Sequence, residues 1–157
     1  MMNLGLLQIA DSALPIGGYT HSWGLEAAIA RGTVHDPETL ERWTTRWLRH
    51  SLGPFEGVLA ASACRATRAG APDALLRLNR LLEASLAPPS IRRASREMGE
   101  QLMALGATWA WSAGRIRDLV GTSPSGTSGW HHPVAFGILG ALADGGPDEV
   151  LAAFLHQ

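Results

Sequence analysis

The residues best placed to do chemistry lie in a short segment near the N-terminus. Residues 14–26 read Leu-Pro-Ile-Gly-Gly-Tyr-Thr-His-Ser-Trp-Gly-Leu-Glu, so a phenol, two hydroxyls and an imidazole occupy consecutive positions. The paired glycines allow a left-handed backbone or close backbone approach, and the proline before them fixes its own φ. We therefore expect a loop of defined geometry that presents Tyr19, Thr20 and His21 at the start of the next helix.

Two interpretations of His21 are equally supported by the sequence. Its ring either caps or packs at the start of the helix, or it contacts a partner protein or a metal ion. Catalysis is disfavoured, because the chain has no phosphate-binding Gly-Lys motif, no Gly-x-Ser-x-Gly and no lysine at all. The single cysteine, Cys64, lies among small residues at helical spacing and is interpreted as a packed thiol. We predict no catalytic residue.

The histidines do not predict a permanent metal site. None forms a His-x-x-x-His or His-Glu-x-x-His pair. His131 and His132 are adjacent, so they point to different sides of a helix, and capping or solvation at a helix start is favoured for them. A transient metal contact at these residues or at His21 stays open.

Length and composition favour one globular domain in a reducing compartment. The chain has 157 residues, a formal net charge of −1 and one cysteine, which argues against strong attraction to nucleic acid or anionic membranes and excludes an intramolecular disulfide. No signal peptide is recognisable, and the longest apolar run, residues 134–143, is too short to span a membrane. We expect a cytoplasmic protein with no nucleic-acid or membrane partner.

The spacing of apolar residues predicts helices nearly throughout and no β-strand, which indicates an all-α bundle of short antiparallel helices. Asp36-Pro37 is a helix start, Gly53-Pro54 is expected to break the helix that follows, and Ser90 is a candidate cap. The Gly/Ser/Thr-rich stretch 121–129 is expected to be a flexible loop. The predicted helices cover residues 4–10, 22–30, 37–52, 55–69, 72–86, 91–105, 109–120, 134–143 and 147–157.

Glycines inside predicted helices indicate close helix packing. Gly99, Gly106, Gly137 and Gly140 each weaken a helix by about 1 kcal/mol relative to alanine, so a packing role is expected in return. Packing within the chain is favoured, although a helix contact in an oligomer uses the same physics. The charged residues 92–100 are interpreted as a solvated helix face with weak ion pairs.

Four blocks of the sequence resemble the UreF family of urease accessory proteins. Residues 6–26 resemble the N-terminal signature of that family, and Phe55–Ala66 resembles its third-helix region. Ile91–Gly99 resembles an Arg-x-x-Ser-x-x-x-Gly block, and His132–Gly137 resembles a His-x-Pro-Val-x-Phe-Gly block. The first and last of these motifs are the more specific, and the resemblance spans essentially the whole chain.

The resemblance implies a non-enzymatic scaffold that helps to insert nickel into apo-urease. Such proteins bridge the accessory protein UreD (also called UreH) and the GTPase UreG, modulate that GTPase, and also occur as homodimers. It implies no stably bound cofactor, with nickel passing through the complex. By position, it places partner-binding residues at Tyr19, Thr20, His21, Ser22 and Glu26.

Family members usually continue beyond the length of this chain. We therefore expect residues 1–157 to form a single UreF-like helical domain that lacks the C-terminal helices and the tail that engages UreD. Two other functions stay open. One is a helical oligomeric interaction module without a metal-delivery role, and the other is a small helical enzyme that binds an anion at the glycine loop.

Overall fold

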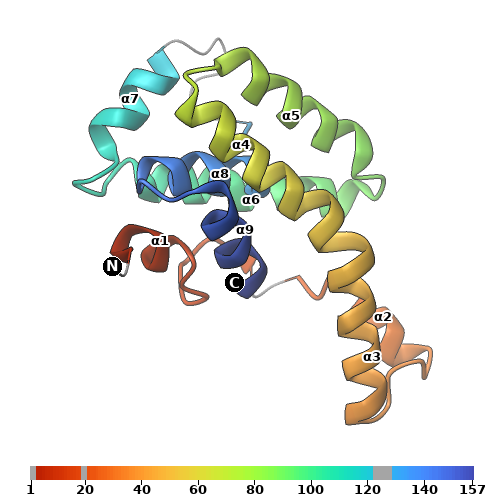
Figure 1. The fold of residues 1–157 in the computed structure, drawn as a ribbon. Helices are drawn as coiled ribbons and strands as arrows, with labels where there is room; N and C mark the ends of the chain where they lie inside the picture. The colour runs from red at the N-terminus through yellow and green to blue at the C-terminus, as the bar shows by residue number, and fades with distance from the viewer. Residues whose placement is uncertain (1–2, 19–20, 122–128) are drawn as a thin grey trace.

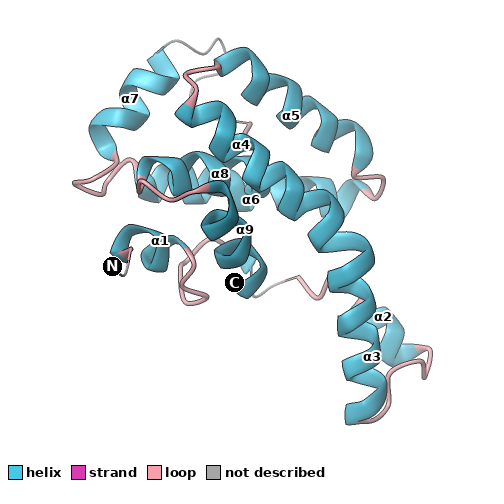
Figure 2. Cartoon of the chain, viewed as in Figure 1, coloured by secondary structure: helices cyan, strands magenta, loops and turns pink. Residues whose placement is uncertain are grey.

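The structure is a computed structural model that describes residues 3–18, 21–121 and 129–157. These residues form helices joined by loops, with no strand among them, which confirms the predicted all-α class (Figure 2). The elements in chain order are α1 (Leu4–Ile9), α2 (Leu25–Ala30), α3 (Pro37–Trp47), the π-helix η2 (Leu48–Gly57), α4 (Val58–Arg68), α5 (Pro72–Ser85), α6 (Pro89–Gly106), α7 (Ala113–Gly121), α8 (His132–Leu142) and α9 (Pro147–His156).

Helix α8 is the centre of the fold. All 11 of its residues are buried, as expected for a helix that is apolar on every side. It packs against α1, α4, α6 and α9, which surround it in Figure 1. Large buried side chains from these helices include Leu6, Ile9, Leu59, Leu102, Met103, Phe136, Leu139, Val150 and Phe154.

Glycines allow the helices to approach α8 closely. A Cβ atom added at Gly137 would lie 2.2 Å from the carbonyl oxygen of Ala60 in α4. A Cβ at Gly106 would lie 2.7 Å from Leu139 Cδ2, and one at Gly140 would lie 2.5 Å from Val150 Cγ2. All three separations are shorter than real Cβ atoms show, so the predicted packing role of these glycines within the chain is confirmed.

The predicted helix break at Gly53-Pro54 is wrong. Helices α3 and α4 are joined without interruption by η2, in which the N–H of Val58 bonds to the carbonyl of Gly53 five residues earlier. In an α-helix a proline ring clashes with the carbonyl four residues before it. The wider π-turn relieves that clash, so Pro54 distorts the helix without ending it.

Helices α2 and α3 form an arm that extends away from the helices around α8 (Figure 1). The predicted start of α3 is confirmed by a capping box, in which Asp36 Oδ1 accepts from Thr39 N–H at 2.7 Å. Thr39 is nevertheless the only buried residue of α3. The indole rings of Trp43 and Trp47 stack along the helix at 6.1 Å.

Other predicted boundaries are also wrong, and α7 begins at Ala113 instead of Trp109. Helix α2 begins at Leu25 instead of Ser22, because Trp23 and Gly24 have φ angles of 50° and 97°, which no α-helix allows. Ser90 is not a cap, since α6 already begins at Pro89 after an extended Pro88. Most of the predicted loop 121–129 lies outside the described residues.

Candidate functional site

The predicted partner-binding loop lies against the first turns of α6. The His21 ring lies 6.0 Å from the ring of Trp23, and both side chains are partly buried. His21, Ser22 and Glu26 line one shallow depression of about 340 Å³ together with residues from the start of α6. The structure thus gathers three of the five predicted partner-binding residues, whereas Tyr19 and Thr20 lie outside the described residues.

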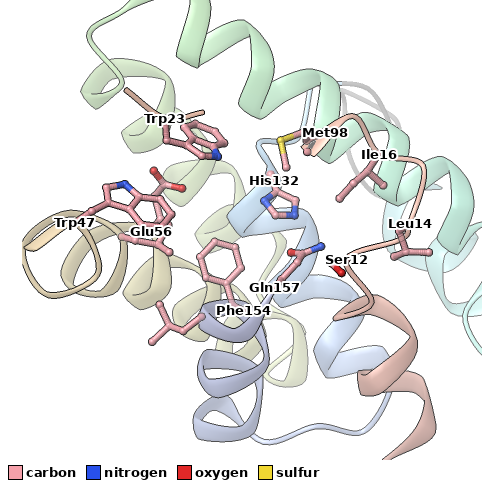
Figure 3. Close-up of a pocket in the computed structure, with 13 residues that line it drawn as sticks. Ser12, Leu14, Ile16, Trp23, Trp47, Glu56, Met98, His132, Phe154 and Gln157 are labelled. Carbon is pink, nitrogen blue, oxygen red and sulfur yellow. The ribbon is translucent and has the colours of Figure 1, made fainter. Parts of the chain in front are cut away.

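A second hollow, an apolar cavity of about 280 Å³, is shown in Figure 3. The loop, the junction of α3 and η2, α6, α8 and α9 all contribute to its walls. Its lining residues are Ser12, Leu14, Ile16, Gly18, Trp23, Trp47, Leu52, Glu56, Met98, His132, Phe154, Leu155 and Gln157. Trp23 lines both the depression and the cavity, two hollows that sequence reasoning did not reveal.

Two ionisable groups in the cavity have perturbed pKa values. Burial raises the pKa of Glu56 to about 7. Burial also lowers the pKa of His132 to about 4, and the neighbouring Gln157 side chain opposes that change. The two side chains do not reach hydrogen-bonding geometry, so His132 Nε2 and Gln157 Oε1 are both buried without a hydrogen-bond partner. At neutral pH His132 is therefore an uncharged ring that packs against Phe136 and Phe154.

The environment of His131 differs from that of His132, as expected for adjacent residues, whose side chains point to different sides of a helix. Its Nδ1 lies 3.1 Å from Ser95 Oγ on α6, and its Nε2 lies 2.9 Å from Glu83 Oε2 on α5. Its backbone N–H donates to Asn79 Oδ1 at 2.8 Å. The expectation that His131 and His132 cap or face solvent is wrong, since both are buried and the N-cap residue His131 makes no side-chain capping bond.

The electrostatics of this cluster fix its hydrogen-bond directions. Burial opposes ionisation of Glu83, but the His131 hydrogen bond and nearby arginines hold the pKa of Glu83 below its usual range. Burial, opposed by Glu83, lowers the pKa of His131, so its ring is uncharged at neutral pH. The carboxylate therefore accepts from His131 Nε2–H, and Nδ1 of the ring accepts from the Ser95 hydroxyl. Serine, histidine and carboxylate also occur together in hydrolases. Ser95 is only 2% exposed, so its hydroxyl is closed to substrate and the cluster joins α5, α6 and α8.

The charged face of α6 is partly as predicted. Arg93 and Glu97 form an exposed ion pair at 3.9 Å along the helix. Arg92 and Arg96 instead reach across to Glu83 on α5, at 3.6 and 3.7 Å. This half of the face contributes to the contact between two helices, which the local sequence pattern did not indicate.

Cys64 is fully buried, and its Sγ lies 3.5 Å from the carbonyl oxygen of Gly145. Burial raises the pKa of the thiol, opposed by Arg68 and Arg65, so its interpretation as a packed thiol is confirmed. Within the described ranges, no set of three or more His, Cys, Asp or Glu side chains is arranged to hold a metal ion. None of the helices described is both long and apolar enough to cross a membrane.

Comparison with known proteins relates the chain to one family. The sequence model of the UreF family matches residues 34–157. The chain is 32% identical over 152 residues to the urease accessory protein UreF of Paenarthrobacter aurescens, which covers 97% of this chain and 65% of that protein. It is 43% identical over 100 residues to that of Azotobacter vinelandii, which covers 64% of this chain and 45% of that protein.

A third similar protein carries the same name, and all three of these relatives are longer than this chain. The urease accessory protein UreF of Lachnoclostridium phytofermentans is 30% identical over 136 residues, 87% of this chain and 59% of that protein. The chain therefore spans about half to two thirds of the length of the curated relatives it matches. An alignment over 97% of the chain includes the loop before α2, which lies outside the range of the family model.

Proposed function

Because the chain belongs to the UreF family of urease accessory proteins, we propose that it acts as a scaffold during the maturation of urease. In this role it holds the accessory protein UreD (UreH) and the GTPase UreG on apo-urease while nickel is inserted, and it modulates the GTPase. The relatives in this family are named for an accessory role and not for an enzyme activity. Nickel is the cargo of the assembly in this proposal, and the chain carries no resident cofactor.

The observation that carries the proposal is the grouping of His21, Ser22 and Glu26 along the start of α6. Loops held on a rigid scaffold are where recognition residues concentrate. Here α6 is anchored in the core through Met98, Leu102 and neighbouring buried residues. An imidazole, a hydroxyl and a carboxylate are thus offered together on a supported surface, as an adaptor that docks a partner protein requires.

Several finer features belong to the same proposal. We place the protein in the cytoplasm, where a single reduced thiol is usual. We also propose that nickel makes its transient contact with this loop at the side chain of His21. Tyr19 and Thr20 are proposed to share the GTPase-binding surface with His21, Ser22 and Glu26.

The experiment is co-purification of the chain with UreG and UreD, together with urease activation in a strain that lacks its own UreF. A UreF of the full length of the relatives is the positive control. Tyr19→Ala combined with His21→Ala should reduce UreG recovery while the circular dichroism spectrum stays unchanged. His50→Ala, at an exposed histidine on η2, is the matched control. Loss of helicity in the double variant would instead make the loop structural, and absence of any complex beside a working control would contradict the proposal.

A second candidate function is a helical oligomeric interaction module with no part in metal delivery. It is favoured by exposed apolar residues on the arm, since Ile29 is 54% exposed and Leu40 is 41% exposed. Such residues could pair with a second copy of the chain. Light scattering on the purified chain tests for oligomers, which the scaffold role also allows as homodimers. Urease activation distinguishes the two functions, because this alternative expects no effect of loop substitutions on it.

A further inference from the structure

Glu56 is a partly buried carboxylate without a compensating charge. It comes from the last turn of η2 and lines the apolar cavity. Burial is the only influence on its pKa, because no positive group or hydrogen-bond donor among the described residues contributes. A carboxyl group in apolar surroundings either takes up a proton or is accompanied by a cation or several donors. A cation bound in this cavity would therefore stabilise the charged form of Glu56.

Two tryptophans flank this carboxylate. Figure 3 shows the carboxylate of Glu56 between the indole rings of Trp23 and Trp47, all three of which line the same cavity. The face of an indole ring attracts cations, and cages of aromatic side chains are a known way to bind ammonium groups. Aromatic walls and an uncompensated carboxylate therefore favour the same class of ligand.

The opposite wall of the cavity supplies further unpartnered polar atoms. His132 is 7% exposed, and its Nε2 is buried without a partner, as is Gln157 Oε1. A carboxamide oxygen can only accept hydrogen bonds. The ligand that satisfies this cavity therefore carries a positive charge and several N–H donors.

We propose that this cavity is a receptor for one arginine side chain of a partner protein. The planar guanidinium would lie against the indole of Trp47 or Trp23 and donate to the Glu56 carboxylate, and its remaining N–H groups would face Gln157. Guanidinium combines a flat stacking surface with five donors, which a compact ammonium does not offer. Tryptophan and arginine also dominate the energetics of protein interfaces. The inference rests on the proposed docking role and names the chemistry that one of its partners would present.

The test uses N-butylguanidinium chloride as the probe and N-butylurea as its uncharged counterpart of similar shape. Titration is followed by the indole N–H signals of Trp23 and Trp47 in heteronuclear NMR spectra, assigned with Trp23→Phe and Trp47→Phe. We expect saturable shifts of both signals with N-butylguanidinium and none with N-butylurea. Glu56→Gln should weaken binding about tenfold or more, as expected for loss of a charged hydrogen-bond partner.

Glu41→Gln, at an exposed position on α3, should leave the affinity unchanged. Glu56→Gln removes a partly buried charge and keeps the side-chain shape, so it should fold, and its circular dichroism spectrum checks this. Should it fail to fold, Trp47→Leu provides the second variant, with the same expected loss of affinity.

Three outcomes would overturn the inference: equal binding of N-butylurea, unchanged affinity in folded Glu56→Gln, or displacement of the probe by stoichiometric NiCl₂, which would make the cavity a metal site. The titration needs no partner protein. Its failure would therefore leave the co-purification result standing, and failure of co-purification would leave a measured guanidinium site in place.

Discussion

The hydroxyl of Ser95 lies 3.1 Å from Nδ1 of His131 and joins α6 to the residue that precedes α8. One turn further along α6, a Cβ atom at Gly99 would lie 2.0 Å from the carbonyl oxygen of Trp130. One turn earlier, Arg92 donates to the carbonyl of Leu86 at 3.0 Å. Positions spaced by three and four residues share one helix face. The Arg-x-x-Ser-x-x-x-Gly block is thus a single strip of α6, and most of it meets the segment that opens α8.

The first prediction concerns that strip. Gly99→Ala should lower the free energy of unfolding by about 3 kcal/mol or more, because the added methyl would overlap backbone atoms of Trp130 and His131 that cannot rotate away. Urea denaturation followed by circular dichroism measures the change.

The matched control is Gly114→Ala in α7. Among the residues described, its added Cβ would meet only Arg117 Nη2, at 3.9 Å, so the better helix propensity of alanine should raise stability by about 0.5–1 kcal/mol. Equal effects of the two substitutions would contradict the close approach of α6 to the start of α8.

The second prediction concerns the buried histidine cluster. Ser95→Ala removes the hydroxyl that donates to His131 Nδ1 and leaves that nitrogen buried without a partner. We expect a loss of about 1–3 kcal/mol in the free energy of unfolding. Ser51→Ala, at an exposed serine on η2, should change it by less than about 0.5 kcal/mol. A neutral Ser95→Ala would mean that the hydroxyl does not support the ring.

Much of the fold could be predicted because its signals are local. Asp36 and Thr39 are three residues apart and form their capping box as expected. The wholly apolar run 134–143 could be assigned to the core by composition alone. Glycines at helical positions indicated close packing, and the structure supplies the partners, such as Ala60 for Gly137.

The remaining features depend on contacts between distant residues. The partners Glu83 and Ser95 lie 48 and 36 residues from His131 in sequence, so no local pattern could indicate them. The π-turn at Pro54 was missed because proline normally ends a helix, whereas η2 continues into α4. The cavity was missed for the same reason as the cluster, since Glu56 and His132 meet in it only because α9 packs against both η2 and α8.

The third prediction concerns Cys64. Because its side chain is fully buried and burial raises the pKa of the thiol, it should not react with Ellman's reagent in the folded protein at neutral pH. The reaction should become rapid in unfolding concentrations of urea. Ser51→Cys supplies an exposed thiol as the positive control, and fast labelling of Cys64 without urea would contradict its position in the core.

The last prediction uses the opposite pH dependences of the two cavity groups. Burial raises the pKa of Glu56 from 4.5 to about 7. The contribution of this group to stability is therefore complete below pH 4.5 and is lost as the pH rises through about 7. Burial lowers the pKa of His132 from 6.5 to about 4, so its contribution is complete above 6.5 and is lost as the pH falls towards 4. In the parent chain the two slopes partly cancel between these limits.

Glu56→Gln should separate these effects. The variant keeps only the histidine dependence, so its stability relative to the parent chain should increase as the pH rises from about 4 to about 8. We expect a total gain of about 2 kcal/mol, reduced from the full shift because the side chain is only partly buried. Urea denaturation at several pH values measures the difference, with Glu41→Gln as the control at an exposed carboxylate. A pH-independent difference for Glu56→Gln would mean that solvent reaches the carboxylate freely, and would remove the basis for a guanidinium partner in this cavity.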